Sequence, residues 1–215
     1  MTDVAIIDYG MGNLRSVSKA IEHVAQGRSV VVTSDPDVVA TAERVVFPGQ
    51  GAMPDCMREL AVRGVREAVL QAAASKPFLG ICIGQQMLFE HSEEGDVAGL
   101  GILPGRVVRF PAAETMPAAG GGHLKVPHMG WNEVRQTAST SHPVLAGIPD
   151  GERFYFVHSY YVVPGAAQLT LGETDYGLRF TSAVARDNIV AVQFHPEKSA
   201  AAGLKLLENF IHWRP

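Results

Sequence analysis

The chain has 215 residues, of which 47% are hydrophobic and 19% are charged, as in an ordinary globular protein with a sizeable core. Its formal net charge is −4 and it has no long basic or acidic run, which argues against binding to nucleic acid or to an anionic membrane surface. We therefore expect a single domain over residues 1–215, with no nucleic-acid or membrane partner.

The first residues and the cysteine content indicate a compartment. Residues 1–7 lead directly into an apolar strand pattern without a basic segment or a cleavage site, and no apolar run approaches membrane-spanning length. We expect a cytoplasmic protein. The two cysteines, Cys56 and Cys82, are then expected to stay reduced, and they are too few for a structural zinc site. At least one thiol is expected to be free to react.

The first half of the chain alternates strand patterns with helical patterns. Short apolar runs predict strands, and longer runs with apolar side chains at helical spacing predict helices. This order indicates consecutive βα units around a parallel sheet. The predicted strands are residues 4–8, 29–32, 45–47 and 78–81, and the predicted helices are residues 13–26 and 54–74.

From Gly105 onward the pattern changes to shorter strand-like runs separated by turn residues, which favours antiparallel strands that extend the sheet. A helix over residues 199–213 is expected to close the fold. Residues 111–122, "PAAETMPAAGGG", have few large side chains and predict an exposed flexible loop. The predicted later strands are residues 106–110, 153–157, 169–171, 183–186 and 189–194.

The stretch "GICIGQQM", residues 80–87, places Cys82 between Gly80 and Gly84 where a strand meets a helical pattern. This is the form of a nucleophile elbow with cysteine in place of serine, a strained turn that requires small neighbours. The thiol would face the first N–H groups of the next helix, which favour a thiolate and can stabilise an oxyanion. A small buried cysteine in a glycine-rich turn is the alternative.

Two further motifs supply what a cysteine nucleophile needs. In "AVQFHPEKS", His195 and Glu197 follow an apolar strand, and Pro196 bends the chain between them, so a base and its orienting group can share one site. Surface His-Glu pairs are common, however. In "VVFPGQGAM", residues 45–53, glycines allow backbone amides to approach a substrate, although an ordinary turn into a helix reads the same way.

In this order and over nearly the whole chain, the three motifs resemble the class I, triad-type glutamine amidotransferases. The resemblance implies an α/β, flavodoxin-like, three-layer fold with a mixed, mainly parallel sheet and an antiparallel extension. It also implies hydrolysis of glutamine to glutamate and ammonia, without a cofactor or a metal. Four stretches are similar to the glutaminase subunits of imidazole glycerol phosphate synthases, an enzyme of histidine biosynthesis: "DYGMGNLRSV" (8–17), "PHMGWNEV" (127–134), "FYFVHSYY" (154–161) and "HPEKS" (195–199).

The resemblance implies a role for each matching residue. Cys82 attacks the side-chain amide carbon of glutamine, His195 acts as base and then as acid, and Glu197 holds the imidazole in the useful tautomer. Backbone N–H groups of Ile83 and, after a peptide reorientation, Gln50 form the oxyanion hole. The residues implied to bind glutamine are Gly49, Gly51, Gln86, His158, Ser159 and Tyr160.

A partner is implied as well, because ammonia released into water near neutral pH is protonated and the chain has no room for a synthase domain. By resemblance the partner is a cyclase subunit, a (βα)8 barrel that docks over the glutaminase site to form a heterodimer. It uses the ammonia to form imidazole glycerol phosphate and AICAR. The candidate interface residues are Asn13, Trp131 and Lys198. The alternative for Trp131 is a core tryptophan, and the alternative for Lys198 is a solvated surface charge.

Other classes fit less well. A dinucleotide-binding enzyme needs a third glycine where Arg15 stands after Gly10-Met11-Gly12, and no Gly-Lys pair supports a phosphate-binding P-loop. No two histidines have His-x-x-x-His spacing, so a metal site is not expected. Two alternatives remain open: a glutaminase subunit for anthranilate or pyridoxal phosphate synthesis, and a non-catalytic binding module of the same fold.

Overall fold

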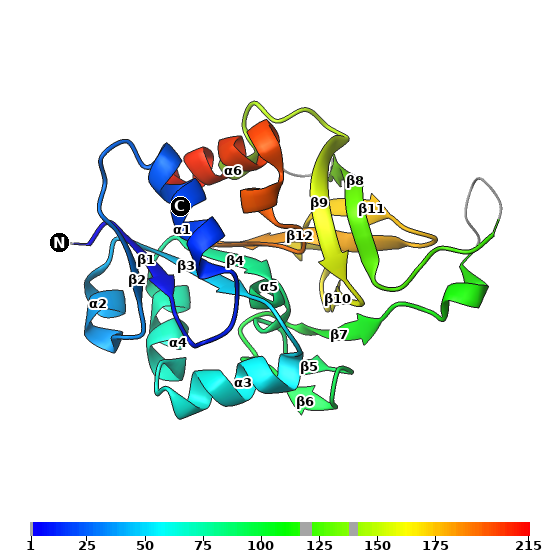
Figure 1. The fold of residues 1–215 in the computed structure, drawn as a ribbon, viewed down its shortest axis with the longest axis horizontal. Helices are drawn as coiled ribbons and strands as arrows, with labels where there is room; N and C mark the ends of the chain where they lie inside the picture. The colour runs from blue at the N-terminus through cyan, green and yellow to red at the C-terminus, as the bar shows by residue number, and fades with distance from the viewer. Residues whose placement is uncertain (1, 117–121, 138–141) are drawn as a thin grey trace.

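Apolar strands from the first half of the chain, joined by one strand from near its end, form the central layer of the protein (Figure 1). The protein is seen here in a computed structural model that describes residues 2–116, 122–137 and 142–215. The strands of this layer are parallel and lie in the order β2-β1-β3-β4-β13. All but β2 are buried along their whole length, which explains their continuous apolar runs. The strands span β1 Val4–Ile7, β2 Val30–Thr33, β3 Arg44–Gly49, β4 Phe78–Cys82 and β13 Ile189–Val192.

Helices cover both faces of this sheet, as Figure 1 shows, with α1 and α6 on one side and α2, α3 and α4 on the other. Alternate strand residues enter two separate cores: Val4 and Ile6 pack with the α1 and α6 side chains, and Ala5 and Ile7 pack with those of α2 to α4. The predicted three-layer, flavodoxin-like architecture is confirmed. The helices span α1 Leu14–Val24, α2 Pro36–Thr41, α3 Met53–Val62, α4 Arg66–Ser75 and α6 Ala200–His212.

The antiparallel extension begins at β12, which pairs with β13 on one side and with β10 on the other. The path continues to β7, which pairs with β5 in parallel, and from β5 to β6 in antiparallel, while β11, β8 and β9 branch from β12. This part of the prediction is also confirmed. The strands are β5 His91–Ser92, β6 Val97–Ala98, β7 Gly105–Arg109, β8 His128–Gln136, β9 Glu152–His158, β10 Tyr160–Pro164, β11 Thr170–Asp175 and β12 Arg179–Arg186.

Several predicted elements differ from the structure. Residues 54–74 form two helices, α3 and α4, because the chain turns at Gly64 with φ +70°, a left-handed value that suits glycine. Helix α2 and strands β5, β6, β8 and β10 were not predicted. The signal for α2 was present, since Pro36 stands at its start and the Asp35 side chain accepts a hydrogen bond from the Asp37 N–H.

The predicted loop over residues 111–122 is described only in part, because residues 117–121 lie outside the described residues. Residues Ala113–Thr115 form a 3-10 turn. Met116 is buried in the core, and its carbonyl oxygen accepts a hydrogen bond from the Leu124 N–H at 2.8 Å. The predicted exposure of the loop is therefore wrong at this position. The remaining 3-10 turns span Pro143–Leu145, Ala167–Leu169 and Pro196–Lys198.

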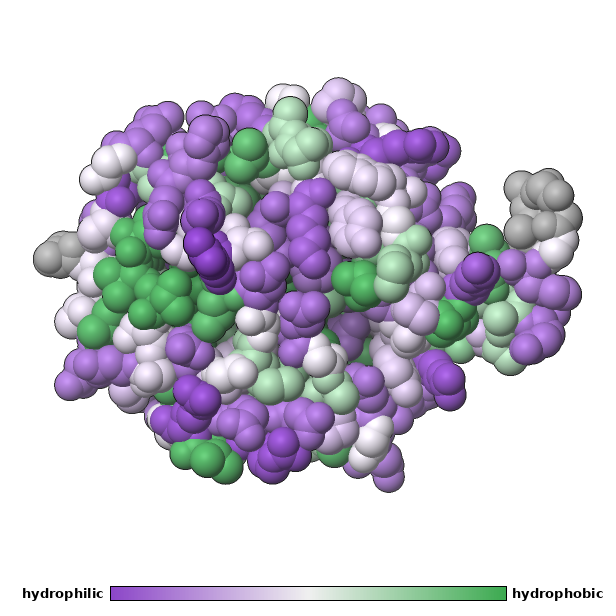
Figure 2. All heavy atoms as spheres, in the orientation of Figure 1, coloured by the Kyte–Doolittle hydropathy of each residue, from purple (hydrophilic) through white to green (hydrophobic). Residues whose placement is uncertain are grey.

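Hydrophilic side chains cover most of the face shown in Figure 2, with smaller hydrophobic areas between them. No helix within the described ranges is long and apolar enough to cross a lipid bilayer.

Candidate active site

Cys82 occupies a strained turn between β4 and α5 (Ile83–Gln86). Its φ of 56° and ψ of −113° are unusual for a residue with a side chain. A Cβ on Gly84 would lie 1.9 Å from the Phe47 carbonyl oxygen, and a Cβ on Gly80 would lie 2.9 Å from the Ala191 Cβ. Close packing therefore requires both glycines, as the elbow motif predicts.

The helix after the elbow is shorter than the motif suggests. Helix α5 has four residues, and the Met87 N–H donates to the Ile83 carbonyl oxygen at 2.8 Å to close a single turn. A single turn has little macrodipole, so a charge on the Cys82 sulfur depends on individual hydrogen-bond donors rather than on a helix end.

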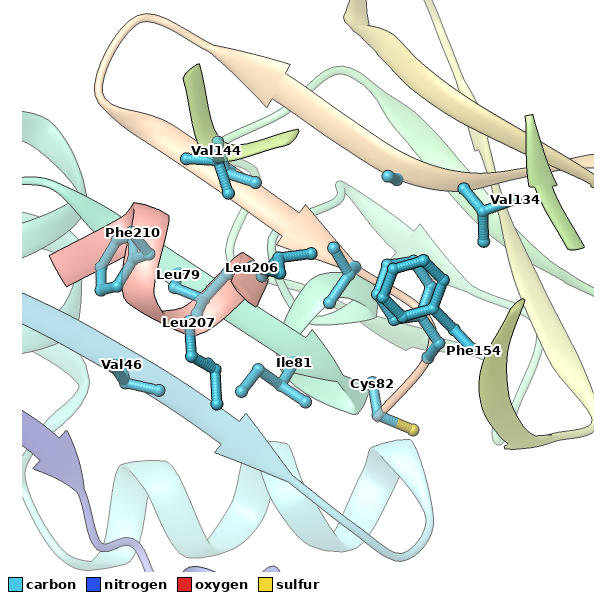
Figure 3. Packing of buried hydrophobic residues seen from close by; sticks show 14 of the residues in the cluster. Val46, Leu79, Ile81, Cys82, Val134, Val144, Phe154, Leu206, Leu207 and Phe210 are labelled. Carbon is cyan, nitrogen blue, oxygen red and sulfur yellow. The ribbon is translucent and has the colours of Figure 1, made fainter. Parts of the chain in front are cut away.

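A cavity of about 250 Å³ lies beside the elbow, smaller than the roughly 300–1,000 Å³ typical of sites for drug-sized ligands. Figure 3 shows Cys82 at the edge of the apolar cluster between α6 and the sheet, with its sulfur directed away from Ile81 and Leu79. The cavity lies next to the carboxyl ends of β3 and β4, where open α/β sheets bind their ligands. Its lining comprises Gln50, Gly51, Cys82, Ile83, Gln86, Glu94, Pro127, Val157, His158, Ser159, Tyr160 and His195.

His195 and Glu197 form a buried pair at this cavity. The His195 Nδ1 donates to the Glu197 Oε1 at 2.8 Å, and the two side chains are 5% and 1% exposed. Within the described ranges, the buried His195 Nε2 has no hydrogen-bond partner, so it remains available to a reacting group. Burial alone would lower the pKa of His195, but the Cys82 sulfur and the Glu197 carboxylate raise that pKa to about 10, which favours the imidazolium form of His195.

The residues that the family resemblance assigns to glutamine binding mostly lie on this cavity, and so do both oxyanion candidates, Gln50 and Ile83. Gly49 is the exception. It lies opposite Cys82 in the β3–β4 register, where a Cβ would come within 2.3 Å of the Tyr9 hydroxyl. Gly49 therefore permits close packing behind the cavity and does not line it.

The sequence did not reveal Glu94 as a site residue. Its carboxylate lines the cavity and its Oε2 accepts a hydrogen bond from the Met53 N–H at 2.8 Å. A carboxylate in this place suits the α-ammonium group of an amino acid. Acidic residues in a loop are usually solvated, so "HSEEGD" offered no distinguishing signal.

Gln193 was missed too, although it lies within the motif "AVQFHPEKS". Its Nε2 donates to the Cys82 Sγ at 3.7 Å, and its Oε1 accepts a hydrogen bond from the Gln86 Nε2 at 2.9 Å. A polar residue between the apolar Val192 and Phe194 was the available signal.

Two of the three candidate interface residues, Trp131 and Lys198, lie near the same ring, that of Tyr155. Trp131 is 49% exposed, which excludes the core position considered for it. Its ring meets that of Tyr155 edge-on at 6.2 Å, and the Lys198 Nζ lies 5.9 Å from the Tyr155 ring centroid. Asn13 is exposed at the start of α1, where its side chain accepts a hydrogen bond from the Ser16 N–H.

Neither cysteine forms a disulfide: both are free and buried. Over the described residues, no group of three or more His, Cys, Asp or Glu side chains is arranged to hold a metal ion.

The model of the family "glutamine amidotransferase class-I" matches residues 5–213. The chain belongs to this family. Among the relatives of this amidotransferase are proteins named imidazole glycerol phosphate synthase subunit HisH. That of Aromatoleum aromaticum is 76% identical over 215 residues and covers 100% of both chains. That of Dechloromonas aromatica is 66% identical over 212 residues and covers 99% of this chain and 97% of the relative.

Solved structures show the same fold for this class-I amidotransferase. A crystal structure of a glutamine amidotransferase matches with a TM-score of 0.71 at 15% identity, over 97% of each chain. A glutamine amidotransferase from Thermotoga maritima matches with a TM-score of 0.58 at 16% identity, over 94% of this chain and 78% of that one. The family and fold predicted from the sequence are confirmed, and the HisH relatives favour their group over the anthranilate and pyridoxal phosphate alternatives.

Proposed function

We propose that Cys82, His195 and Glu197 hydrolyse glutamine, and that the ammonia passes to a cyclase subunit. The chain is a glutamine-hydrolysing subunit of an imidazole glycerol phosphate synthase, in histidine biosynthesis. The main support for the proposed triad is the environment of the buried His195. One ring nitrogen is held by Glu197, and the other is unpartnered within the described part of the chain, at a cavity that also contains Cys82.

The reaction has two steps. The Cys82 thiolate attacks the side-chain amide carbon of glutamine, and the imidazolium of His195 protonates the leaving ammonia. This leaves a glutamyl thioester. Water, deprotonated by His195, then attacks the thioester carbonyl and releases glutamate and the thiol. Glu197 keeps the Nδ1 proton in place and stabilises the imidazolium in both steps.

Each tetrahedral intermediate carries an oxyanion, for which the Ile83 N–H is the first donor. The Gln50 N–H becomes the second donor when its peptide reorients. Loss of one such donor typically costs about 2.7–4 kcal/mol of transition-state stabilisation, so this peptide can keep glutamine from being hydrolysed when no acceptor is bound.

Glutamine binds with its backbone groups away from the elbow. The Gln86 Nε2 donates both of its hydrogens, one to the Tyr160 carbonyl oxygen at 3.0 Å and one to Gln193 at 2.9 Å. The polar atom that Gln86 offers to a ligand is therefore its Oε1. Together with the Glu94 carboxylate it supplies acceptors for the α-ammonium group, while Gly51, Ser159 and Tyr160 supply backbone groups.

The partner is a (βα)8 barrel cyclase that docks over Trp131 and Lys198 and receives ammonia directly, in a cytoplasmic heterodimer. Residues 1–215 act in it as one glutaminase domain. Direct transfer is needed because free ammonia in water near neutral pH becomes ammonium, which is not a nucleophile.

The test uses Cys82→Ala in complex with the cyclase. We expect no glutamate release from glutamine, while synthesis of imidazole glycerol phosphate from added ammonium salts continues, because the acceptor site belongs to the partner. In the wild type, glutamate release should rise strongly when cyclase and acceptor nucleotide are both present. Glutamine turnover by Cys82→Ala at the wild-type rate would remove the proposed nucleophile, and a wild-type complex without glutaminase activity would indicate a binding module.

A further inference from the structure

Gln193 is a buried primary amide directly behind the nucleophile. It follows β13, is 0% exposed, and its backbone N–H donates to the Ser182 carbonyl oxygen at 2.8 Å. An amide in such a place destabilises the fold unless hydrogen bonds compensate for the lost water. Its two side-chain contacts, to Gln86 and to Cys82, supply that compensation.

The orientation of this amide follows from the groups around it. The Tyr160 carbonyl oxygen can only accept a hydrogen bond, so the Gln86 atom 3.0 Å away must be the nitrogen. The same nitrogen lies 2.9 Å from Gln193 and donates there, so the Gln193 atom that faces it must be the oxygen. The nitrogen of Gln193 therefore faces the Cys82 sulfur and donates to it.

We propose that Gln193 is a catalytic residue whose Nε2–H group holds and stabilises the Cys82 thiolate before attack. This inference rests on the proposed role of Cys82 as nucleophile. The thiolate is a full charge at a site that is 6% exposed, and helix α5 is too short to stabilise it through a macrodipole. A hydrogen bond to a charged acceptor is stronger than one between neutral groups. The uncharged amide supplies it without competing with His195 for the Glu197 carboxylate.

Two substitutions separate the contact to sulfur from the contact to Gln86. Gln193→Glu keeps an oxygen acceptor for the Gln86 N–H and replaces the donor facing the sulfur by a carboxylate oxygen. Gln193→Met removes both contacts at similar volume. We expect kcat for glutamine to fall at least about tenfold in both variants, since hydrogen bonds to charged groups are typically worth about that factor or more. We expect KM to rise only in Gln193→Met, because only that variant loses the contact to Gln86.

The deciding readout is the rate at which iodoacetamide alkylates Cys82, followed between pH 5 and 9 by mass spectrometry in complex with the cyclase. We expect the pH midpoint of alkylation to rise by about one unit in Gln193→Met and by more in Gln193→Glu. The titratable groups that line the cavity or act on the sulfur are unchanged in both variants: His195, Glu197, His158, Glu94, Tyr160, Tyr9 and Cys56. Cys56 is the internal control for folding, because burial raises the pKa of its thiol to about 11 and slow alkylation reports an intact core.

Gln85→Met is the matched control. Gln85 is equally buried and its Nε2 donates to the Ala191 carbonyl oxygen at 3.2 Å, away from the sulfur, so its alkylation profile should match the wild type. An equal shift in Gln85→Met, or wild-type midpoints in both Gln193 variants, would overturn the inference.

If a Gln193 variant does not fold, Gln193→Asn provides the test, because it keeps a buried amide but is one methylene too short to reach the sulfur. Inactive Cys82→Ala beside fully active Gln193 variants would leave the proposed function standing and remove only this inference.

Discussion

His128 and His158 face each other across β8 and β9, with the His128 Nδ1 2.9 Å from the His158 Nε2. The His158 Nδ1 donates to the Tyr160 carbonyl oxygen at 2.8 Å, so its Nε2 must accept and the His128 Nδ1 must donate. The His128 Nε2 then accepts from the Asn132 Nδ2 at 3.3 Å. This arrangement requires two neutral imidazoles and holds the backbone that lines the cavity beside Cys82.

The stability of the fold should therefore fall at acid pH. Burial lowers the pKa of His128 to about 4, and burial together with the neighbouring His128 lowers that of His158 to about 3, against about 6.5 in an unfolded chain. Below pH 6.5 the unfolded state binds more protons, so the contribution of the pair is complete above that pH and is lost as the pH falls towards 4 and 3. Each imidazole adds a slope of up to about 1.4 kcal/mol per pH unit to the free energy of unfolding, measured by urea titration between pH 7.5 and 4.5.

His128→Phe identifies the source of that slope. The phenyl ring keeps the stacking on Phe156 and Tyr176 but does not titrate, so the slope should decrease although stability at pH 7.5 also falls. His23→Phe changes an exposed histidine of α1 and should leave the slope unchanged. An unaltered slope in His128→Phe would show that other groups control the acid response.

Glu197→Gln should separate charge from hydrogen bonding in the triad. An amide oxygen can still accept from the His195 Nδ1, but the carboxylate that helps to raise the pKa of His195 to about 10 is gone. The pKa of His195 should fall, the imidazolium should be less populated, and kcat for glutamine should drop at least about 100-fold. Steady-state glutamate release in the complex measures this.

Glu208→Gln is a suitable control for that substitution. Glu208 is a surface carboxylate on α6 that pairs with Lys205 at 2.9 Å, and its loss should leave kcat unchanged. If Glu197→Gln retained wild-type turnover, the orienting role of Glu197 would be wrong.

Trp131→Ala should weaken the complex and leave the isolated fold stable. The side chain is half-exposed and meets Tyr155 at its edge, so little of the core depends on it. Large aromatic residues dominate the binding energy of interfaces, and we expect the Kd for the cyclase to rise at least about 30-fold. Isothermal titration calorimetry measures this, with Val62→Ala, an exposed apolar residue on α3, as control. Unchanged affinity would place the cyclase elsewhere.

Local patterns predicted the parts of the structure that local chemistry determines. The buried strands, the apolar stripe of α1 and the elbow around Cys82 each follow from a few neighbouring residues. Residues 154–161 show the limit: a strand was predicted only over residues 153–157, whereas the chain forms β9 and β10 on either side of Ser159. That break depends on pairing with β8 and β7, which are distant in sequence.

Two site residues were not predicted for the same reason, namely that their roles depend on residues distant in sequence. Gln193 acquires its role only because folding brings it to Cys82 and Gln86, more than a hundred residues away along the chain. Glu94 likewise reaches the cavity through its contact with the start of α3. In both cases the residue type is common, and only its three-dimensional neighbours distinguish it.

Gly84→Ala tests whether packing, rather than backbone flexibility, demands the second glycine of the elbow. A methyl group there would lie 1.9 Å from the Phe47 carbonyl oxygen, a backbone atom that cannot move without displacing β3. We expect the free energy of unfolding to fall by at least about 3 kcal/mol, seen as a Tm lower by roughly 6–12 °C in calorimetry. Gly101→Ala is the counterpart, because that glycine has φ +66° but no atom within 4 Å of the added Cβ, and strain alone should cost about 1–2 kcal/mol. An equal or smaller loss in Gly84→Ala would mean that the elbow can shift away from β3, and the close approach would not be what selects glycine.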